Sequence, residues 1–158
     1  MTDRDHSPRR VLIVCTANQC RSPMAEGLIA ARLAAEGRQS RLAVSSAGTW
    51  ARAGEPATDK AVATLAERGI DIRAHRSREV TAELLDEADL VLVMTAGHRE
   101  AILAEHPRTA DKLRLMSELA DETWDLADPV SQPIEAYRAT ATLLDRLIDL
   151  GWPRILGG

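Results

Sequence analysis

Residues 11–23 read Val11-Leu12-Ile13-Val14-Cys15-Thr16-Ala17-Asn18-Gln19-Cys20-Arg21-Ser22-Pro23. The apolar run at 11–14 is typical of a central strand that is buried on both faces. A short polar loop follows it. We expect a helix to start at Ser22-Pro23, because serine suits an N-cap and proline suits the first helical position. This stretch therefore predicts a strand, a tight loop and a helix in direct succession.

The rest of the chain alternates between the two kinds of element. Apolar runs predict further strands at residues 42–44, 89–94 and 112–116. Helical spacing predicts helices at residues 22–37, 58–67, 81–87, 95–105 and 134–151, with loops at 45–50 and 117–133. Strands that alternate with helices indicate right-handed crossovers, a parallel sheet and helices on both of its faces. The fold class predicted is α/β.

Length and composition restrict the class of protein, the partners and the compartment that can be expected. The 158 residues are 45% hydrophobic and carry a net charge of −4 at pH 7, which is typical of one globular domain and argues against nucleic acid as a partner. No apolar run is long enough to span a membrane. Residues 1–9 are polar and are expected to form a disordered lead-in to a single domain at 10–158. With two cysteines and no export signal, the cytoplasm is the expected compartment.

The loop from Cys15 to Ser22 has the chemistry of an anion site. Successive backbone N–H groups before a helix N-terminus can surround an oxyanion, and Arg21 adds a planar, charged fork for two phosphate oxygens. The same surroundings favour the Cys15 thiolate, which is then a nucleophile facing the phosphate. Ser22 can donate a hydrogen bond to that sulfur. The alternative, on these eight residues alone, is a buried cysteine at a strand end beside a helix-capping serine.

Two other loops are expected to join this one. The loop that carries Trp50 and the loop that carries Asp128-Pro129 each follow a predicted strand. Ligands of parallel α/β sheets bind beyond the carboxyl ends of the strands. The three loops should therefore meet at one edge of the sheet.

With these residues in place, the chain resembles the low-molecular-weight protein tyrosine phosphatases from Val11 to the final helix. The resemblance is carried by four segments in the family's order, which are residues 14–26, 45–50, 69–77 and 128–129. It implies a three-layer α/β/α fold with a central four-stranded parallel sheet. It also implies a two-step reaction through a cysteinyl-phosphate, with no metal and no cofactor.

The resemblance also implies the role of each site residue. Cys15 would attack phosphorus, Arg21 would hold the phosphate oxygens, and Asp128 would protonate the leaving oxygen before it takes a proton from water. The loop residues that would surround the phosphate are Thr16, Ala17, Asn18, Gln19 and Cys20. For Asp128 the alternative is a turn-initiating Asp-Pro.

The resemblance also implies supporting roles for six residues. Asn18, Ser46 and His75 would form a hydrogen-bond network beneath the loop, although an isolated histidine could equally cap a helix or be exposed. Cys20 would be the family's second cysteine, which can form a protective disulfide with Cys15; otherwise it is a small buried hydrophobic residue. Trp50 would form a wall of the substrate cleft or pack under its loop. Trp124 could form a second wall or pack in the core.

The expected activity is hydrolysis of phosphorylated protein side chains, most simply phosphotyrosine, with the phosphoprotein as partner and inorganic phosphate as product. Gln19 stands where tyrosine phosphatases are usually aliphatic, and Val130-Ser131 stands where an aromatic residue often grips the phenol ring. A protein phosphoarginine phosphatase is therefore the main alternative. Thiol-dependent arsenate reduction and non-catalytic phosphate binding are more remote ones. Ala17 replaces a usual glycine, so a positive φ there would be costly.

Overall fold

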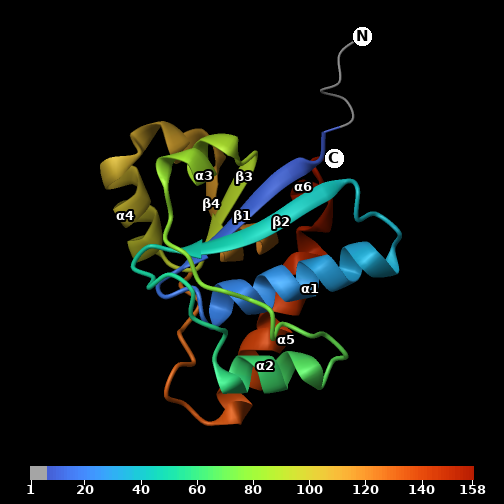
Figure 1. Ribbon diagram of the computed structural model, residues 1–158. Coiled ribbons are helices and arrows are strands. Elements are labelled where there is room, and N and C mark those ends of the chain that lie inside the picture. The colour runs from blue at the N-terminus through green and yellow to red at the C-terminus, as the bar shows by residue number, and fades with distance from the viewer. Residues whose placement is uncertain (1–6) are drawn as a thin grey trace.

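The computed structural model describes residues 7–158, so residues 1–6 of the predicted lead-in lie outside the described residues. A four-stranded parallel sheet in the order β2-β1-β3-β4 forms the centre of the fold (Figure 1). Its strands are β1 (Arg9–Cys15), β2 (Leu42–Gly48), β3 (Leu90–Val93) and β4 (Leu113–Leu115). The first strand therefore begins at Arg9, one residue before the predicted domain boundary.

Helices cover both faces of the sheet (Figure 1). On one face lie α1 (Arg21–Ala35) and α5 (Ile134–Leu150), with α2 (Asp59–Ala66) and α6 (Trp152–Leu156) packed beside them. On the other face lie α3 (Ala82–Glu87) and α4 (Ala96–Glu105). The three-layer α/β/α architecture and the four-stranded parallel sheet that the sequence predicted are both confirmed.

The side chains of β1 supply both halves of the core. Val11, Ile13 and Cys15 belong to the apolar cluster beneath α1 and α5, whereas Leu12 and Val14 belong to the cluster beneath α3 and α4. All five are at most 2% exposed. A strand with period-2 side chains can fill two cores only if every position is apolar, which explains the uninterrupted run.

The start of α1 differs from the prediction. The helix begins at Arg21 with Cys20 as its N-cap residue, so the prediction that Ser22 caps it is wrong. Ser22 lies inside the first turn, and its hydroxyl contacts Cys15 instead of a backbone N–H. Pro23 is still tolerated, because the N–H groups of a first turn have no helical partner.

β2 is longer than predicted. Residues 45–48, which were predicted to form a loop, continue the strand because they pair in register with residues 12–15 of β1. A Cβ atom placed on Gly48 would lie 2.3 Å from the Thr16 carbonyl oxygen. Glycine is therefore required where the end of β2 packs against the loop that follows β1.

The remaining helices lie close to their predicted positions. The hydroxyls of Thr58, Thr81 and Thr95 cap α2, α3 and α4. Two short 3₁₀ helices flank β4, namely η2 (Pro107–Lys112) and η3 (Met116–Ala120), and η3 occupies the start of the predicted 117–133 loop. The rest of that loop leads directly to α5 and carries Asp128.

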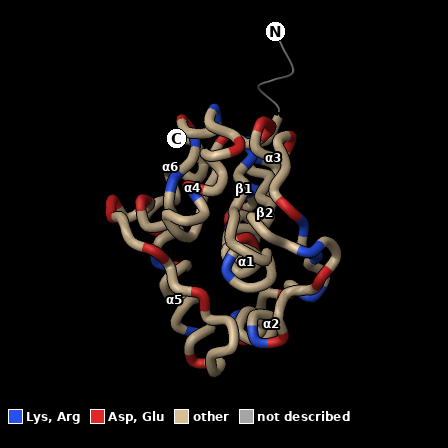
Figure 2. Tube along the Cα trace, turned by 90° about the vertical axis from the view of Figure 1, so that its left-hand side faces the viewer, with Lys and Arg blue, Asp and Glu red and all other residues tan. Residues whose placement is uncertain are grey.

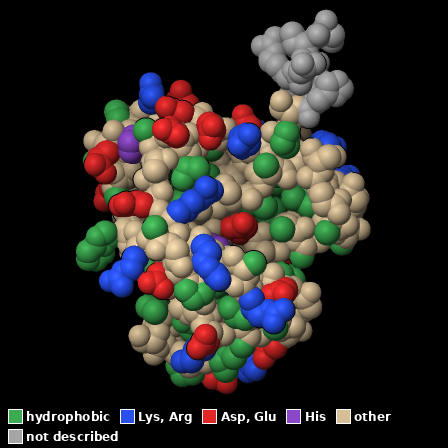
Figure 3. Space-filling view, in the orientation of Figure 1, with side chains coloured by type: hydrophobic (Ala, Val, Ile, Leu, Met, Phe, Trp, Pro, Cys, Tyr) green, Lys and Arg blue, Asp and Glu red, His purple; other side chains and the backbone are tan. Residues whose placement is uncertain are grey.

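Acidic and basic residues are interspersed over the surface (Figure 2), and the face in Figure 3 shows the same mixture among scattered apolar side chains. An anionic ligand would therefore be attracted by local groups rather than by a large field of one sign. Within residues 7–158, no helix combines the length and the apolar character that crossing a membrane requires.

Candidate active site

The loop between β1 and α1 turns sharply at one residue. Asn18 has a φ of 59°, in the left-handed region, whereas Ala17 is not among the residues with positive φ. Asparagine tolerates this conformation better than most residues with a Cβ atom. The expected cost at Ala17 therefore does not arise, because the next residue makes the turn.

The sulfur of Cys15 has a hydroxyl partner. Cys15 Sγ and Ser22 Oγ lie 2.9 Å apart, and Asn18 Nδ2 donates to the same Ser22 oxygen at 2.8 Å. Because Ser22 Oγ accepts from Asn18, its own hydrogen is available to the sulfur. Such a bond stabilises the negative charge that the sulfur carries when it acts as a leaving group.

A hydrogen-bond network extends from Ser22 to Glu26. The second hydrogen of Asn18 Nδ2 is donated to Ser46 Oγ at 2.9 Å, and Ser46 donates in turn to Glu26 Oε1 at 2.6 Å. A carboxylate can only accept, so Glu26 fixes the direction of the bond from Ser46, and the Asn18 amide nitrogen, which can only donate, fixes the direction of the bond from Ser22 to Cys15. The sequence analysis did not single out Glu26.

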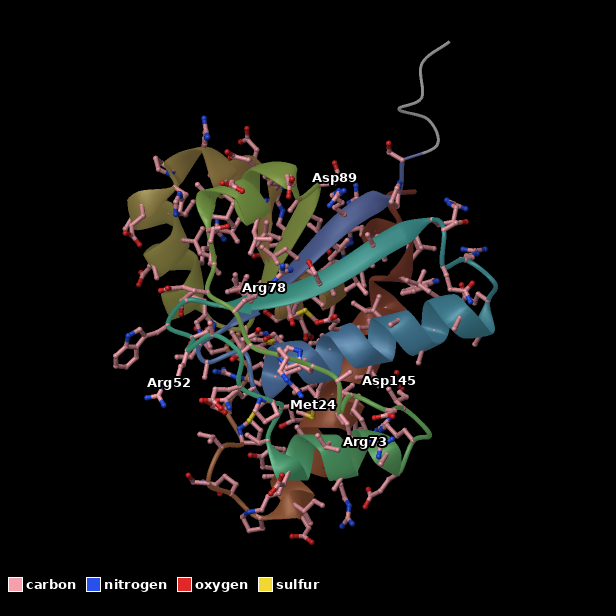
Figure 4. The ribbon with its side chains drawn as sticks, in the orientation of Figure 1. Met24, Arg52, Arg73, Arg78, Asp89 and Asp145 are labelled. Carbon is pink, nitrogen blue, oxygen red and sulfur yellow. The ribbon has the colours of Figure 1, made fainter. Side chains whose placement is uncertain are left out.

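Two residues of the 70–80 segment hold the same asparagine. His75 Nε2 lies 2.7 Å from the Asn18 carbonyl oxygen, which can only accept, so His75 donates. The Arg78 backbone N–H donates to Asn18 Oδ1 at 3.0 Å, and Arg78 Nε, which lies beside β2 in Figure 4, donates to the Ser46 carbonyl at 3.0 Å. Asn18, Ser46 and His75 thus come together as predicted, and Arg78 joins them.

Replacing Glu26 with leucine is expected to lower kcat for an aryl phosphate about tenfold, because losing a charged acceptor frees Ser46 to reorient and disturbs Asn18. Glu26→Gln should keep most of the activity, since the amide oxygen still accepts from Ser46. Steady-state kinetics on all variants would measure this. The exposed Glu100→Gln serves as a control, and equal rates for Glu26→Leu and the unmodified protein would contradict the network's role.

Arg21 is buried beside the loop. It is 4% exposed, and its Nη1 donates to the Leu126 carbonyl at 2.8 Å. Nη2 lies 3.4 Å from Thr16 Oγ1 and 3.4 Å from Asp128 Oδ2. Nε is buried and has no hydrogen-bond partner among the described residues. A buried guanidinium nitrogen without a partner is costly, and a phosphate oxygen in the loop would satisfy it.

Asp128 reaches the same cavity from the loop before α5. Its side chain is 38% exposed, and its Oδ1 accepts from the Val130 backbone N–H at 3.0 Å. A cavity of about 50 Å³ is lined by Cys15, Ala17, Gln19, Cys20, Arg21, Thr58, Asp128 and Val130. The predicted nucleophile, cation and acid, which lie far apart in sequence, therefore share one cavity.

Cys20 lines this cavity with a second sulfur. Its Sγ lies 3.5 Å from Thr58 Oγ1 and 3.6 Å from Tyr137 Oη, and both cysteines are free thiols. Burial raises the pKa of the Cys20 thiol above its usual range. Cys20 is therefore held as a neutral thiol at pH 7 beside the predicted nucleophile.

The two tryptophans predicted near the cleft and Gln19 of the predicted phosphate-binding loop have different surroundings. The Trp50 backbone N–H donates to the Thr16 carbonyl at 3.0 Å, but the residue is 83% exposed and is not packed under the loop. Gln19 Nε2 donates to the Pro56 carbonyl at 3.1 Å. Trp124 packs against the core beneath α5 and donates from Nε1 to Glu122. Neither tryptophan lines the cavity that contains Cys15.

His98, which the sequence analysis did not single out, contacts the loop from α4. Its Nε2 lies 2.8 Å from Thr16 Oγ1, and the residue is 6% exposed. Burial first, and the charge of Arg21 second, lower the pKa of His98 from 6.5 to about 4. His98 is therefore neutral at pH 7. Over residues 7–158, no group of three or more His, Cys, Asp or Glu side chains is arranged to hold a metal ion.

This pKa predicts an acid-sensitive stability. Between pH 6.5 and about 4 the unfolded chain binds a proton at His98 that the folded chain excludes, so the free energy of unfolding falls as the pH is lowered. The loss from this residue alone should approach about 3 kcal/mol. Urea unfolding at pH 7 and pH 4.5 would measure it. His98→Gln should lose less stability, and an identical pH dependence for both proteins would contradict the prediction.

Comparisons with known proteins agree with this geometry. The family model described as low molecular weight phosphotyrosine protein phosphatase matches residues 10–150. A probable low molecular weight protein-tyrosine-phosphatase, EpsP of Ralstonia nicotianae, is 37% identical and covers 93% of this chain and 96% of its own. A protein-arginine-phosphatase of Geobacillus stearothermophilus is 42% identical, with 90% and 93% covered.

Solved structures show the same relation. The crystal structure of a low molecular weight protein tyrosine phosphatase from T. tengcongensis superposes with a TM-score of 0.87 at 41% identity, covering 92% of this chain and 99% of that one. The matched region includes β1, the Cys15 loop, the four strands and α5. The chain therefore belongs to the low molecular weight phosphotyrosine protein phosphatase family.

Proposed function

We propose that the protein is a cysteine-dependent phosphatase that hydrolyses phosphorylated protein side chains. The observation that carries this proposal is the buried Arg21 Nε, which has no partner among residues 7–158 and belongs to a side chain that lines the cavity containing Cys15. A tetrahedral dianion would satisfy the guanidinium and place phosphorus next to a sulfur that already accepts a hydrogen bond. No other chemistry uses the thiolate, the guanidinium and the carboxylate together as directly.

In the first step, the Cys15 thiolate attacks phosphorus and the bond between phosphorus and the substrate's oxygen or nitrogen breaks. Arg21 and the loop amides of residues 16–21 hold the three equatorial oxygens, where charge accumulates in the transition state. Asp128 donates its proton to the leaving atom, which departs neutral. The product of this step is a cysteinyl-phosphate and the dephosphorylated side chain.

In the second step, water attacks the cysteinyl-phosphate and Asp128, now ionised, takes a proton from it. Inorganic phosphate leaves and Cys15 returns to a thiolate. The hydrogen bond from Ser22 stabilises the departing sulfur, and the network from Asn18 to Glu26 keeps Ser22 oriented. The network therefore contributes most to the step in which sulfur is the leaving group.

Phosphotyrosine is the substrate that we propose first. The relative EpsP is named a tyrosine phosphatase. The exposed Trp50 ring stands on the loop beside Thr16 and offers a flat apolar surface for a phenol ring. The cavity itself is narrow and fits a phosphate group, so the side chain that carries it must rest on the rim.

Phosphoarginine is the second candidate, and Gln19 favours it. Because the Gln19 amide nitrogen is held by the Pro56 carbonyl, its Oε1 is left as an acceptor that a guanidinium N–H could use. Val130, rather than an aromatic residue, also lines the cavity. The Geobacillus relative is named a protein-arginine-phosphatase.

The experiment compares kcat/KM for one peptide that carries phosphotyrosine, phosphoarginine or phosphoserine at the same position. We expect the phosphotyrosine peptide to be hydrolysed fastest and the phosphoserine peptide slowest. Gln19→Leu should reduce turnover of the phosphoarginine peptide more than that of the phosphotyrosine peptide. Negligible turnover of all three would refute the proposed function, and a faster phosphoarginine peptide would reverse the order of the two substrates.

We further propose that the protein works in the cytoplasm on phosphoproteins, because both cysteines are free thiols and the nucleophile needs a reducing environment. Cell fractionation with an antibody would test the compartment. Recovery of the protein mainly outside the cytosolic fraction would contradict it.

A further inference from the structure

His98 and Arg21 reach the same hydroxyl from opposite faces of the sheet. His98 lies in the first turn of α4, where its N–H donates to Thr95 Oγ1 at 3.1 Å, and Arg21 is the first residue of α1. Figure 1 shows α4 and α1 on opposite sides of the strands. Thr16, the residue after the nucleophile, lies between the two side chains and contacts both.

The directions of these two bonds follow from their chemistry. A guanidinium can only donate, so Thr16 Oγ1 accepts from Arg21 Nη2 at 3.4 Å. The single hydrogen of the Thr16 hydroxyl is then free to be donated to His98 Nε2 at 2.8 Å. Neutral His98 accepts it in the tautomer that carries its proton on Nδ1, and the lowered pKa of His98 keeps the imidazole neutral.

The two residues at the ends of this hydrogen-bond series, Arg21 and His98, each carry an unusual nitrogen atom. Within residues 7–158, the buried side-chain nitrogens or oxygens that have no hydrogen-bond partner are Arg21 Nε and His98 Nδ1. Burying a polar nitrogen without a hydrogen-bond partner destabilises a fold. Such an arrangement is therefore expected to serve another purpose. The Arg21 side chain lines the cavity that contains Cys15, and the imidazole of His98 is kept although one of its nitrogens is unsatisfied.

The Thr16 hydroxyl competes with the general acid for the same donor. Arg21 Nη2 lies 3.4 Å from Thr16 Oγ1 and also 3.4 Å from Asp128 Oδ2. If the Thr16 oxygen were turned away, Nη2 would have only the carboxylate and the guanidinium plane would rotate toward it. Arg21 would then present a poorer fork to the phosphate.

We propose that His98 is a positioning residue of the phosphatase: it orients the Thr16 hydroxyl so that Arg21 keeps its guanidinium aligned with the phosphate-binding loop. The inference rests on the proposed function. It extends that function to a residue on the far face of the sheet, whose hydrogen bonds go to Thr16 and Thr95 rather than to the nucleophile or the acid. The alternative is that His98 contributes only packing between α4 and the sheet.

The test compares His98→Leu, which keeps the bulk, with His98→Gln, whose terminal amide can still accept from Thr16. For His98→Leu we expect about a tenfold lower kcat/KM for an aryl phosphate and about a tenfold higher inhibition constant for inorganic phosphate. For His98→Gln both values should stay within about threefold of the unmodified protein. His106→Leu, at the other end of α4, is the matched control and should change neither value.

Two further measurements separate positioning from packing. The loss of kcat/KM in His98→Leu should be equal for good and poor leaving groups, because the substitution disturbs the alignment of Arg21 and not the acid Asp128. Adding His98→Leu to Thr16→Val should cause no further loss, since the shared hydroxyl is already gone. Thermal unfolding of each variant checks that the variant is folded under the conditions of the kinetic assay.

The outcomes are distinct. An unchanged phosphate inhibition constant in a folded His98→Leu protein would overturn the inference, as would equal losses in the leucine and glutamine variants. Additive losses with Thr16→Val would also overturn it. If the unmodified protein bound inorganic phosphate but hydrolysed no phosphate ester, the proposed function would fail, while phosphate binding by calorimetry would still report on His98.

Discussion

Replacing Cys15 with serine is expected to lower hydrolysis of p-nitrophenyl phosphate by roughly 10⁴-fold or more, while the fold is retained. A serine hydroxyl is not ionised at neutral pH, and an un-ionised alcohol is a much weaker nucleophile than a thiolate. The oxygen would also be a poorer leaving group in the second step. Initial rates with enzyme in excess would measure the loss of the first step directly.

Phosphate binding provides the internal control for this variant. Arg21 and the loop amides are untouched, so calorimetry with inorganic phosphate should give an affinity within about threefold of that of the unmodified protein. Removing the thiolate also removes a negative charge next to the anion, which favours tighter rather than weaker binding. Near-normal hydrolysis by Cys15→Ser would show that another group is the nucleophile.

The second large effect is expected for Asp128→Ala. Without a proton donor, expulsion of a poor leaving group such as phenoxide should slow by about 10²- to 10³-fold. p-Nitrophenolate needs less protonation, so its release should slow by roughly tenfold. Measuring kcat for a series of aryl phosphates should therefore give a steeper dependence on leaving-group acidity than in the unmodified protein.

A carboxylate elsewhere on the surface serves as the control. Asp111 is exposed in η2, and Asp111→Ala should leave the leaving-group dependence unchanged. Asp128→Asn should behave like the alanine variant, because an amide keeps the shape but cannot donate a proton of comparable acidity. If every substrate slowed equally in Asp128→Ala, the residue would act through Arg21 alignment rather than as the acid.

The fold could be predicted from the sequence where one strong local signal decided each element. The apolar run at 11–14 and the threonine caps mark their strand and helices without help from distant residues. Residues 45–48 carry no such signal. Serine, alanine and glycine have little tendency to form strands, and these residues are extended because β1 pairs with them.

The same distinction between local sequence signals and contacts with distant residues applies to the site. Cys15 and Arg21 could be predicted because their residue types in a strand–loop–helix segment fit only a few kinds of chemistry, whereas Asp128 was assigned through the resemblance to a family. Glu26, Leu126 and His98 could not be predicted, because each contributes through a partner that is distant in sequence. The bond from Arg21 to Leu126 spans 105 residues and uses a backbone carbonyl, which every residue has. The histidine contact spans 82 residues.

Ser22 illustrates how a correct pattern can give a wrong assignment. Serine before proline at a helix start usually caps the helix, and propensity alone favours that role. In this protein, the tight loop brings Cys15 within 2.9 Å of the hydroxyl, and the hydrogen bond from Asn18 leaves the hydroxyl with one hydrogen to donate. The tertiary contact therefore determines the role of the residue.

The order of the elements along the chain has a consequence during synthesis on the ribosome. Arg21 and Asp128 are separated by 107 residues, and α5, which closes the core over α1, follows both. A nascent chain thus exposes its thiol-bearing segment long before the acid and the covering helix emerge. Because domains fold once their last packing element is available, turnover begins only after α5 has left the ribosome. Incomplete chains that are still being synthesised are therefore expected to be inactive.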